Sequence, residues 1–205
     1  MFAELQSGGI FIYPLLAVAL LGVACSIDRS YIFWRYTRHP AKVMACLSDP
    51  RFGWERLQAL LAEAAPQSGY VRFLRVIAEN TDQPLWLIES RAGEEAAMFE
   101  RKLGQGLWIL ETVVTAAPLL GLLGTISGMV GAFRVFGGTG AVDPRAVTGG
   151  VAEALIATAV GIVTALVALS AYNFFSHRQA LVLDELERLG TQLMDRIRLD
   201  REGAP

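Results

Sequence analysis

The chain has 205 residues, of which 53% are hydrophobic and 19% are charged, and its formal net charge is −2 at pH 7. This composition is too apolar for an ordinary soluble domain, and it lacks the basic excess that nucleic-acid binding requires. The cysteines and the histidines are isolated from one another, so they indicate neither a disulfide framework nor a metal site.

The first hydrophobic segment covers residues 10–27 and reads IFIYPLLAVALLGVACSI. Residues 1–9 contain no Lys or Arg, whereas a signal peptide normally begins with basic residues. Asp28 and Arg29 follow the segment, and the aromatic and basic run from Trp34 to Arg38 is typical of a membrane interface. We therefore predict a retained membrane helix over residues 10–27.

Residues 28–107 form the longest polar region of the chain. Helical periodicity is present over residues 42–64 and 71–79, and prolines and glycines interrupt it. From Leu85 the helical pattern continues toward the next hydrophobic segment without a proline, which predicts one long helix.

Two further hydrophobic segments, residues 108–136 and 149–175, contain stretches without any charge, TVVTAAPLLGLLGTISGMVGAF and ALIATAVGIVTALVALSA. Each stretch is about as long as the roughly 20 residues that a helix needs to cross a bilayer. Lipid offers no partner to backbone amides and carbonyls, so both segments must be helical. The sequence therefore predicts an all-α integral membrane protein with three transmembrane helices.

Basic residues near the ends of these helices predict the orientation. They follow the first helix, precede the second and follow the third: Arg29, Arg35, Arg38, Lys42, Arg101, Lys102, Arg178 and Arg188. The positive-inside rule then places residues 1–9 and the link 137–148 on the outer side of the membrane, and residues 28–107 and 176–205 in the cytoplasm. In the cytoplasmic tail, apolar residues recur every 3 or 4 positions from Val182 to Ile197, which predicts a helical extension whose apolar face needs a cover.

Small residues dominate the second and third membrane helices. At about 100° per residue, Gly121, Gly124, Gly128 and Gly131 fall on one face of the second helix, which favours close helix packing. We interpret Pro118 as a kink in that helix rather than as a ligand.

The polar residues of these helices have both structural and functional interpretations. Glu153 either complements the start of the third helix or serves ion transport. Thr125 and Thr158 either bond to backbone carbonyls and neighbouring helices or take part in transport. The chain has no nucleotide motif and no nucleophile–base pair, so we predict neither a catalytic residue nor a cofactor.

Two motifs carry a resemblance to a known family. APLLGLLGTISGM at residues 117–129 and GGVAEALIATAVGIV at residues 149–163 resemble the signatures of the ExbB/TolQ proton-channel subunits, relatives of the flagellar stator protein MotA. One helix, a large loop, two helices and a tail also resemble the three-helix ExbB/TolQ branch.

The resemblance implies a pentamer in the bacterial inner membrane around a dimer of an ExbD/TolR-type partner with one helix and a membrane aspartate. It implies that Thr125, Thr158 and Glu153 lie on a proton pathway, and that the second and third helices line the pore. Pro118, Gly121, Gly124, Gly128, Gly161 and Thr164 would then pack the helices or line the pore. Proton motive force would drive work at the outer membrane through a TonB/TolA-like third component.

Other functions remain open at this point. The helices could serve only as a structural oligomeric scaffold, or the assembly could be a stator for surface motility. A small-solute transporter is disfavoured because the chain has no inverted repeat. Hydroxyls with a carboxylate suit sodium as well as protons.

Overall fold

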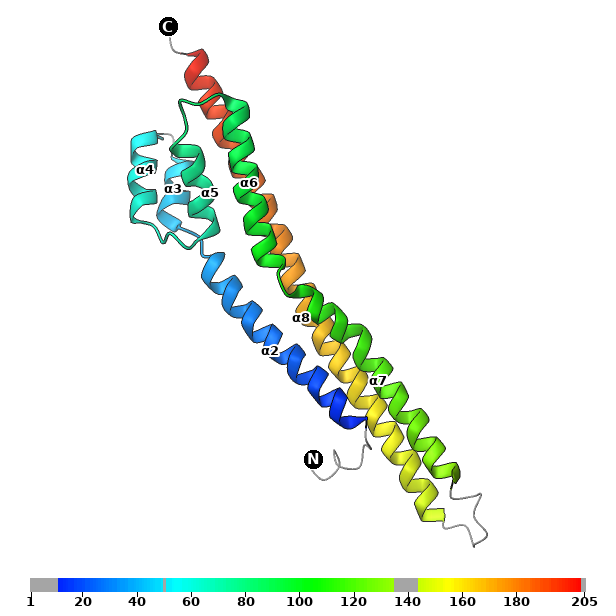
Figure 1. Cartoon of the computed structure of the whole chain (residues 1–205). Coiled ribbons are helices and arrows are strands. Elements are labelled where there is room, and N and C mark those ends of the chain that lie inside the picture. The colour runs from blue at the N-terminus through cyan, green and yellow to red at the C-terminus, as the bar shows by residue number, and fades with distance from the viewer. Residues whose placement is uncertain (1–10, 50, 135–143, 204–205) are drawn as a thin grey trace. The chain divides into compact units, whose positions relative to one another are not determined.

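The computed structural model describes residues 11–49, 51–134 and 144–203, and within this part of the chain the only regular structure is helical (Figure 1). The helices are α2 (Ile12–Tyr36), α3 (Ala41–Ser48), α4 (Trp54–Glu63), α5 (Gly69–Ala78), α6 (Leu85–Gly104), α7 (Leu107–Arg134) and α8 (Pro144–Glu202). Among the described residues, 3 helices are long and apolar enough to cross a membrane. The predicted all-α class and the predicted number of candidate spans are thus confirmed.

Two helices extend beyond the segments predicted from hydrophobicity. α2 continues past residue 27 to Tyr36, and α8 begins at Pro144, inside the region assigned to the link. Proline suits the first position of a helix because its fixed φ is helical and its missing amide hydrogen is not needed there. Residues 1–10, 135–143 and 204–205, which include most of the predicted link, lie outside the described residues.

The prediction of one continuous helix from Leu85 into the second membrane segment is wrong. α6 ends at Gly104 and α7 begins at Leu107. Gly106, between them, has a φ of 85°. This left-handed backbone is readily accessible only to glycine, and it ends the helical path that the side-chain pattern suggested.

The chain divides into two compact units. The first unit contains residues 1–28 and 106–175, and the second contains residues 29–105 and 176–205. Each unit is described here by itself.

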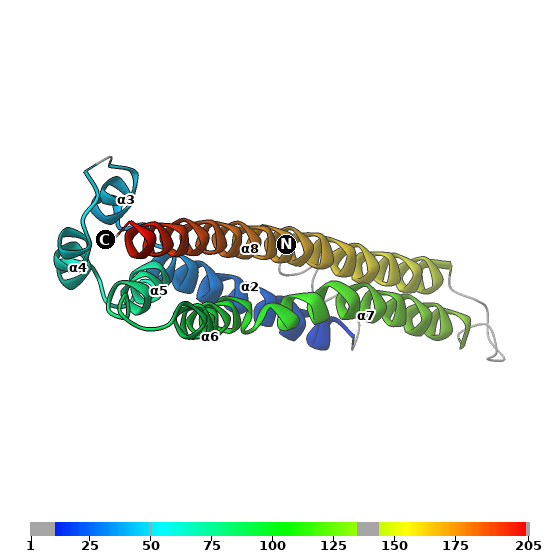
Figure 2. The same cartoon turned by 90° about the horizontal axis from the view of Figure 1, so that it is seen from above.

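In the first unit, α2 packs against α7 and α8. Ile12 and Leu15 of α2 are buried with Ala117 of α7 and Ala165 of α8. Figures 1 and 2 show α7 and the first half of α8 running side by side. The core at this place is built from small residues of α7 and α8 and from larger ones of α2.

In the second unit, α3, α4 and α5 form a small bundle that packs with α6 and the second half of α8. Tyr70 of α5 is fully buried, and its hydroxyl donates a 2.7 Å hydrogen bond to Glu185 of α8. The apolar stripe of the tail is buried within the same chain, at Val182, Leu186, Leu189, Leu193 and Ile197. Another subunit is therefore not needed to cover this stripe.

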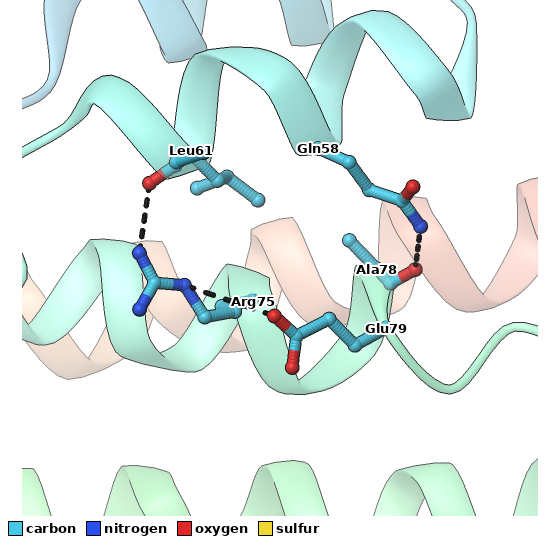
Figure 3. A pocket seen from close by; sticks show the side chains of 6 residues that line it. Gln58, Leu61, Arg75, Ala78 and Glu79 are labelled. Carbon is cyan, nitrogen blue, oxygen red and sulfur yellow. Dashed lines mark hydrogen bonds and ion pairs between the residues drawn. The ribbon is translucent and has the colours of Figure 1, made fainter.

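A pocket of about 530 Å³ lies between α4 and α5, and its polar side chains already have partners in the protein (Figure 3). Gln58 of α4 donates a 2.6 Å hydrogen bond to the carbonyl of Ala78, and Arg75 of α5 donates a 2.8 Å bond to the carbonyl of Leu61. Arg75 also lies 4.0 Å from the carboxylate of Glu79 (Figure 3). We interpret these contacts as structural, because they connect α4 to α5.

Candidate functional site

At the interface between α7 and α8, backbone atoms of the two helices lie in close contact. A Cβ atom added at Gly161 of α8 would lie 2.6 Å from the carbonyl oxygen of Ala117 and 3.2 Å from the Cα of Gly121. A Cβ added at Gly121 would in turn lie 3.0 Å from the Cα of Thr158. Real Cβ atoms do not approach carbonyl oxygens so closely, so glycine at these positions permits the close helix contact.

The same interface continues along α7 at Gly124 and Gly128. Added Cβ atoms would lie 2.7 Å from the Cβ of Ala157 and 2.9 Å from the Cβ of Ala154, respectively. Gly131 differs, because an added Cβ there meets nothing within 4 Å. Of the four glycines predicted to share one packing face, three contact α8 and Gly131 does not.

Thr158 connects the two helices through its side chain. Its hydroxyl, half-buried, donates a 3.0 Å hydrogen bond to the carbonyl of Gly121. In a regular α-helix this carbonyl also accepts the amide of Thr125, four residues later. The carbonyl of Gly121 is therefore the shared acceptor for the side-chain hydroxyl of Thr158 and the backbone amide of Thr125, the two predicted pathway threonines.

The hydroxyl of Thr125 bonds within its own helix. It donates a 2.7 Å hydrogen bond to the carbonyl of Leu122, and the residue is half-buried. A threonine hydroxyl has one hydrogen to donate and two lone pairs to accept with. Both Thr125 and Thr158 thus use their donor on the backbone and keep acceptor capacity for water or another side chain.

The remaining predicted site residues lie along the same pair of helices. Glu153 and Thr164 of α8 and Pro118 of α7 are half-buried. Within the described part of the chain, no hydrogen bond or ion pair engages the carboxylate of Glu153. Because Pro118 has no amide hydrogen, the carbonyl of Val114 lacks its usual helical donor, which introduces a polar atom into the apolar stretch of α7.

The burial of one charged residue was not predicted from the sequence. In the second unit, Arg29 is only 5% exposed, and its guanidinium donates to the backbone carbonyl of Gln105 beyond the end of α6. The sequence offers no signal for this contact, because Arg29 looks like one of several basic residues that follow a membrane helix. The contact shows that Arg29 points into the protein rather than toward solvent.

Residues 112–133 of α7 and 154–171 of α8 are tightly packed and carry no charge, hydroxyls lie along both stretches, and Glu153 directly precedes the second. The sequence profile of the MotA/TolQ/ExbB proton channel family matches residues 62–188, which include α7 and α8 as far as residue 188. The chain belongs to the MotA/TolQ/ExbB proton channel family.

Three relatives illustrate the extent of the similarity. The ExbB-like 3 protein of Synechocystis sp. is 32% identical over 191 residues, which cover 83% of this chain and 82% of that protein. The ExbB-like 1 protein of the same organism is 27% identical over 197 residues, or 93% of this chain and 76% of the relative. The biopolymer transport protein ExbB of Xanthomonas campestris is 43% identical over 94 residues, which are 46% of this chain and 37% of that protein.

Membership of the MotA/TolQ/ExbB family confirms the resemblance that the two motifs suggested. The family is one of membrane proton channels, not of enzymes. This agrees with the three apolar helices found among the described residues.

Proposed function

We propose that this protein is the proton-conducting subunit of an inner-membrane motor that uses proton motive force for work at the outer membrane. Its direct partner would be an ExbD/TolR-type protein with a single membrane helix and an aspartate in that helix. A TonB/TolA-like third component would carry the work outward.

The observation that carries this proposal is the distribution of polar groups along α7 and α8. Residues 112–133 and 154–171 contain no charge, whereas Thr125 and Thr158 place hydroxyls among tightly packed small residues. Hydroxyls bind water without the cost of burying a charge in the membrane. A proton path of this kind needs a carboxylate at mid-membrane, and a partner helix would have to supply it.

Glu153 suits the entrance to such a path. It lies ten residues into α8, before the uncharged stretch, and it is half-buried. A carboxylate near the end of an apolar segment can still reach water, so it can collect or release protons at a smaller cost than one at the centre.

In this proposal several subunits, five by analogy with the family, surround the partner helices. Residues 1–9 and the link 137–148 face the periplasm, and residues 28–107 and 176–205 lie in the cytoplasm. The excess of basic residues beside the cytoplasmic ends supports this orientation. One charge moving through 100 mV gains about 2.3 kcal/mol, enough to bias a conformational step.

Proton flux in proteoliposomes provides the test. The complex with its copurified partner is reconstituted, a membrane potential is imposed, and internal pH is followed with a fluorescent dye. Thr125→Val is the sharpest variant, because the bond that its hydroxyl makes lies within α7 and its loss leaves the α7–α8 contact intact. We expect Thr125→Val and Glu153→Gln to lower flux at least tenfold while the complex keeps its mass.

Thr115→Val is the matched control. Thr115 also lies on α7 and bonds to carbonyls of its own helix, but it is exposed and outside the proposed path. Its flux should equal that of the wild type. Wild-type flux in both Thr125→Val and Glu153→Gln would contradict the proposal.

A structural scaffold is the second candidate, and the hydrogen bonds of Thr125 and Thr158 to backbone carbonyls favour it. A scaffold predicts that Thr125→Val is tolerated in every assay and that no acidic partner helix copurifies. Mass determination of the complex from native membranes separates the two functions. The identity of the copurified partner would also distinguish outer-membrane work from surface motility.

A further inference from the structure

The outward face of α2 is apolar well beyond the predicted end of the first membrane helix. Leu20, Ile27, Tyr31 and Trp34 are 70%, 66%, 51% and 69% exposed. Their spacing of 7, 4 and 3 residues places them on one face of the helix. This face therefore continues without a break to Trp34.

The acidic and basic pair that follows residue 27 does not end this face. Arg29 is buried, with its guanidinium on the carbonyl of Gln105. Asp28 lies about 100° around the helix from Ile27, away from the apolar stripe. The change from apolar to charged side chains instead occurs between Trp34 and Arg38, which lies two residues past the end of α2.

Aromatic and basic side chains are paired at this change. The guanidinium of Arg38 lies 5.8 Å from the centre of the Trp34 ring, and that of Arg35 lies 5.9 Å from the centre of the Tyr31 ring. Exposed Trp and Tyr with adjacent Arg are typical of the headgroup level of a bilayer. The end of α2 is thus built for the membrane surface.

A cavity of about 300 Å³ opens directly after this point, among the segment between α2 and α3, α4 and the start of α5. Its polar lining includes Arg38, His39, Lys42 and Glu63, and its apolar lining includes Val43 and Leu60. Two permanent positive charges thus face one carboxylate, and the apolar part can accommodate glycerol carbons.

The wall of the cavity is fixed to the core of the second unit. The His39 ring lies 4.7 Å from the ring of buried Tyr70, and its Nε2 lies 3.8 Å from the carboxylate of Glu185. The hydroxyl of Ser68 donates a 3.0 Å hydrogen bond to the carbonyl of Arg38. The basic segment is therefore held in place rather than free to move along the surface.

We propose that this cavity binds the phosphate-bearing headgroup of an anionic phospholipid. Arg38 and Lys42 would bind the phosphate, and the lipid chains would lie along the face of Tyr31 and Trp34. Basic pockets beside membrane helices bind anionic headgroups by charge and hydrogen bonding. The proposal does not depend on the transport function, because none of these residues belongs to the α7–α8 interface.

Native mass spectrometry of the full complex provides the test. The complex is purified from vesicles that contain equal amounts of phosphatidylglycerol and phosphatidylcholine, and the lipids that remain bound are identified. At about fivefold per basic residue near a membrane surface, Arg38→Gln/Lys42→Gln should lower phosphatidylglycerol retention roughly 25-fold. Arg51→Gln/Arg188→Gln, which removes two exposed charges outside the cavity, should retain phosphatidylglycerol as the wild type does.

Two results would overturn the proposal. Equal phosphatidylglycerol retention in the wild type and both double variants would mean that the cavity does not select the lipid. Retention of added inorganic phosphate without any lipid would assign the cavity to a free anion. If Arg38→Gln/Lys42→Gln fails to assemble, photo-crosslinking of the wild type with headgroup-labelled phosphatidylglycerol replaces it, and labelling must fall on residues 38–43.

Discussion

The hydroxyl of Thr158 reaches the backbone carbonyl of Gly121, 37 residues earlier in the chain, at 3.0 Å. This contact is feasible because Gly121 has no side chain, and a Cβ there would lie 3.0 Å from the Cα of Thr158. The same pair of residues therefore determines both how close α7 and α8 lie and where a hydroxyl is placed in the membrane.

Loss of the Thr158 hydroxyl should weaken the α7–α8 contact measurably. Bonds of this kind between membrane helices contribute about 0.6 kcal/mol on average, so we expect Thr158→Val to lower the free energy of unfolding by about that amount. Thermal unfolding of the complex in detergent, followed by circular dichroism, measures the change. Thr158→Ser keeps the donor and should retain most of the stability, and equal loss in both variants would contradict the role of the hydrogen bond.

Alanine at Gly161 should disrupt the interface more strongly. The new Cβ would lie 2.6 Å from the carbonyl oxygen of Ala117, so the helices must separate, and overpacking of this kind costs about 1–3 kcal/mol. Gly131→Ala is the matched control, because its Cβ meets nothing within 4 Å. Unfolding midpoints should fall for Gly161→Ala and stay equal or rise for Gly131→Ala. A fall of the same size in both would mean that close approach is not the cause.

The end of α6 should be sensitive to substitution at Gly106. Its φ of 85° lies in the left-handed region, where a residue with a Cβ costs about 1–2 kcal/mol. We expect Gly106→Ala to lower the unfolding midpoint. Gly53→Ala serves as the comparison, because Gly53 has a φ of −145° and open space around it, and it should be neutral.

Tyr70 should make the second unit sensitive to alkaline pH. Burial, and secondly the hydrogen bond to Glu185, raise the pKa of its hydroxyl above the usual value of about 10. A raised pKa in the folded state means that folding favours the neutral phenol. The contribution of Tyr70 to the free energy of unfolding is therefore complete below pH ~10 and is lost as the pH rises above that value. The test compares wild type with Tyr70→Phe at rising pH, since the titration of all other groups cancels in the difference.

At neutral pH Tyr70→Phe should be less stable by about 1 kcal/mol, because the bond to Glu185 is lost. The difference between the two proteins should shrink above pH ~10. A stability difference between the two proteins that stays constant up to pH ~12 would show that the pKa of Tyr70 does not change on unfolding.

Several features of this protein follow from the sequence alone because they depend on neighbours in the chain. An uncharged run such as residues 112–133 must be helical in a bilayer, wherever the rest of the chain lies. The small residues at Gly121, Gly124 and Gly128 indicate a packing face by their spacing. The motifs around Thr125 and Thr158 were sufficient to identify the family.

Other features depend on which parts of the chain meet, and only the tertiary structure decided them. The spacing that grouped Gly131 with the other glycines could not show that α8 is beyond its reach. The pattern from Leu85 could not show that the backbone turns at Gly106, since side-chain periodicity contains no information on φ. The hydrogen bond from Arg29 to Gln105 joins residues 76 positions apart, and the bond from Thr158 to Gly121 joins residues 37 positions apart. Such contacts are set by the packing of whole helices.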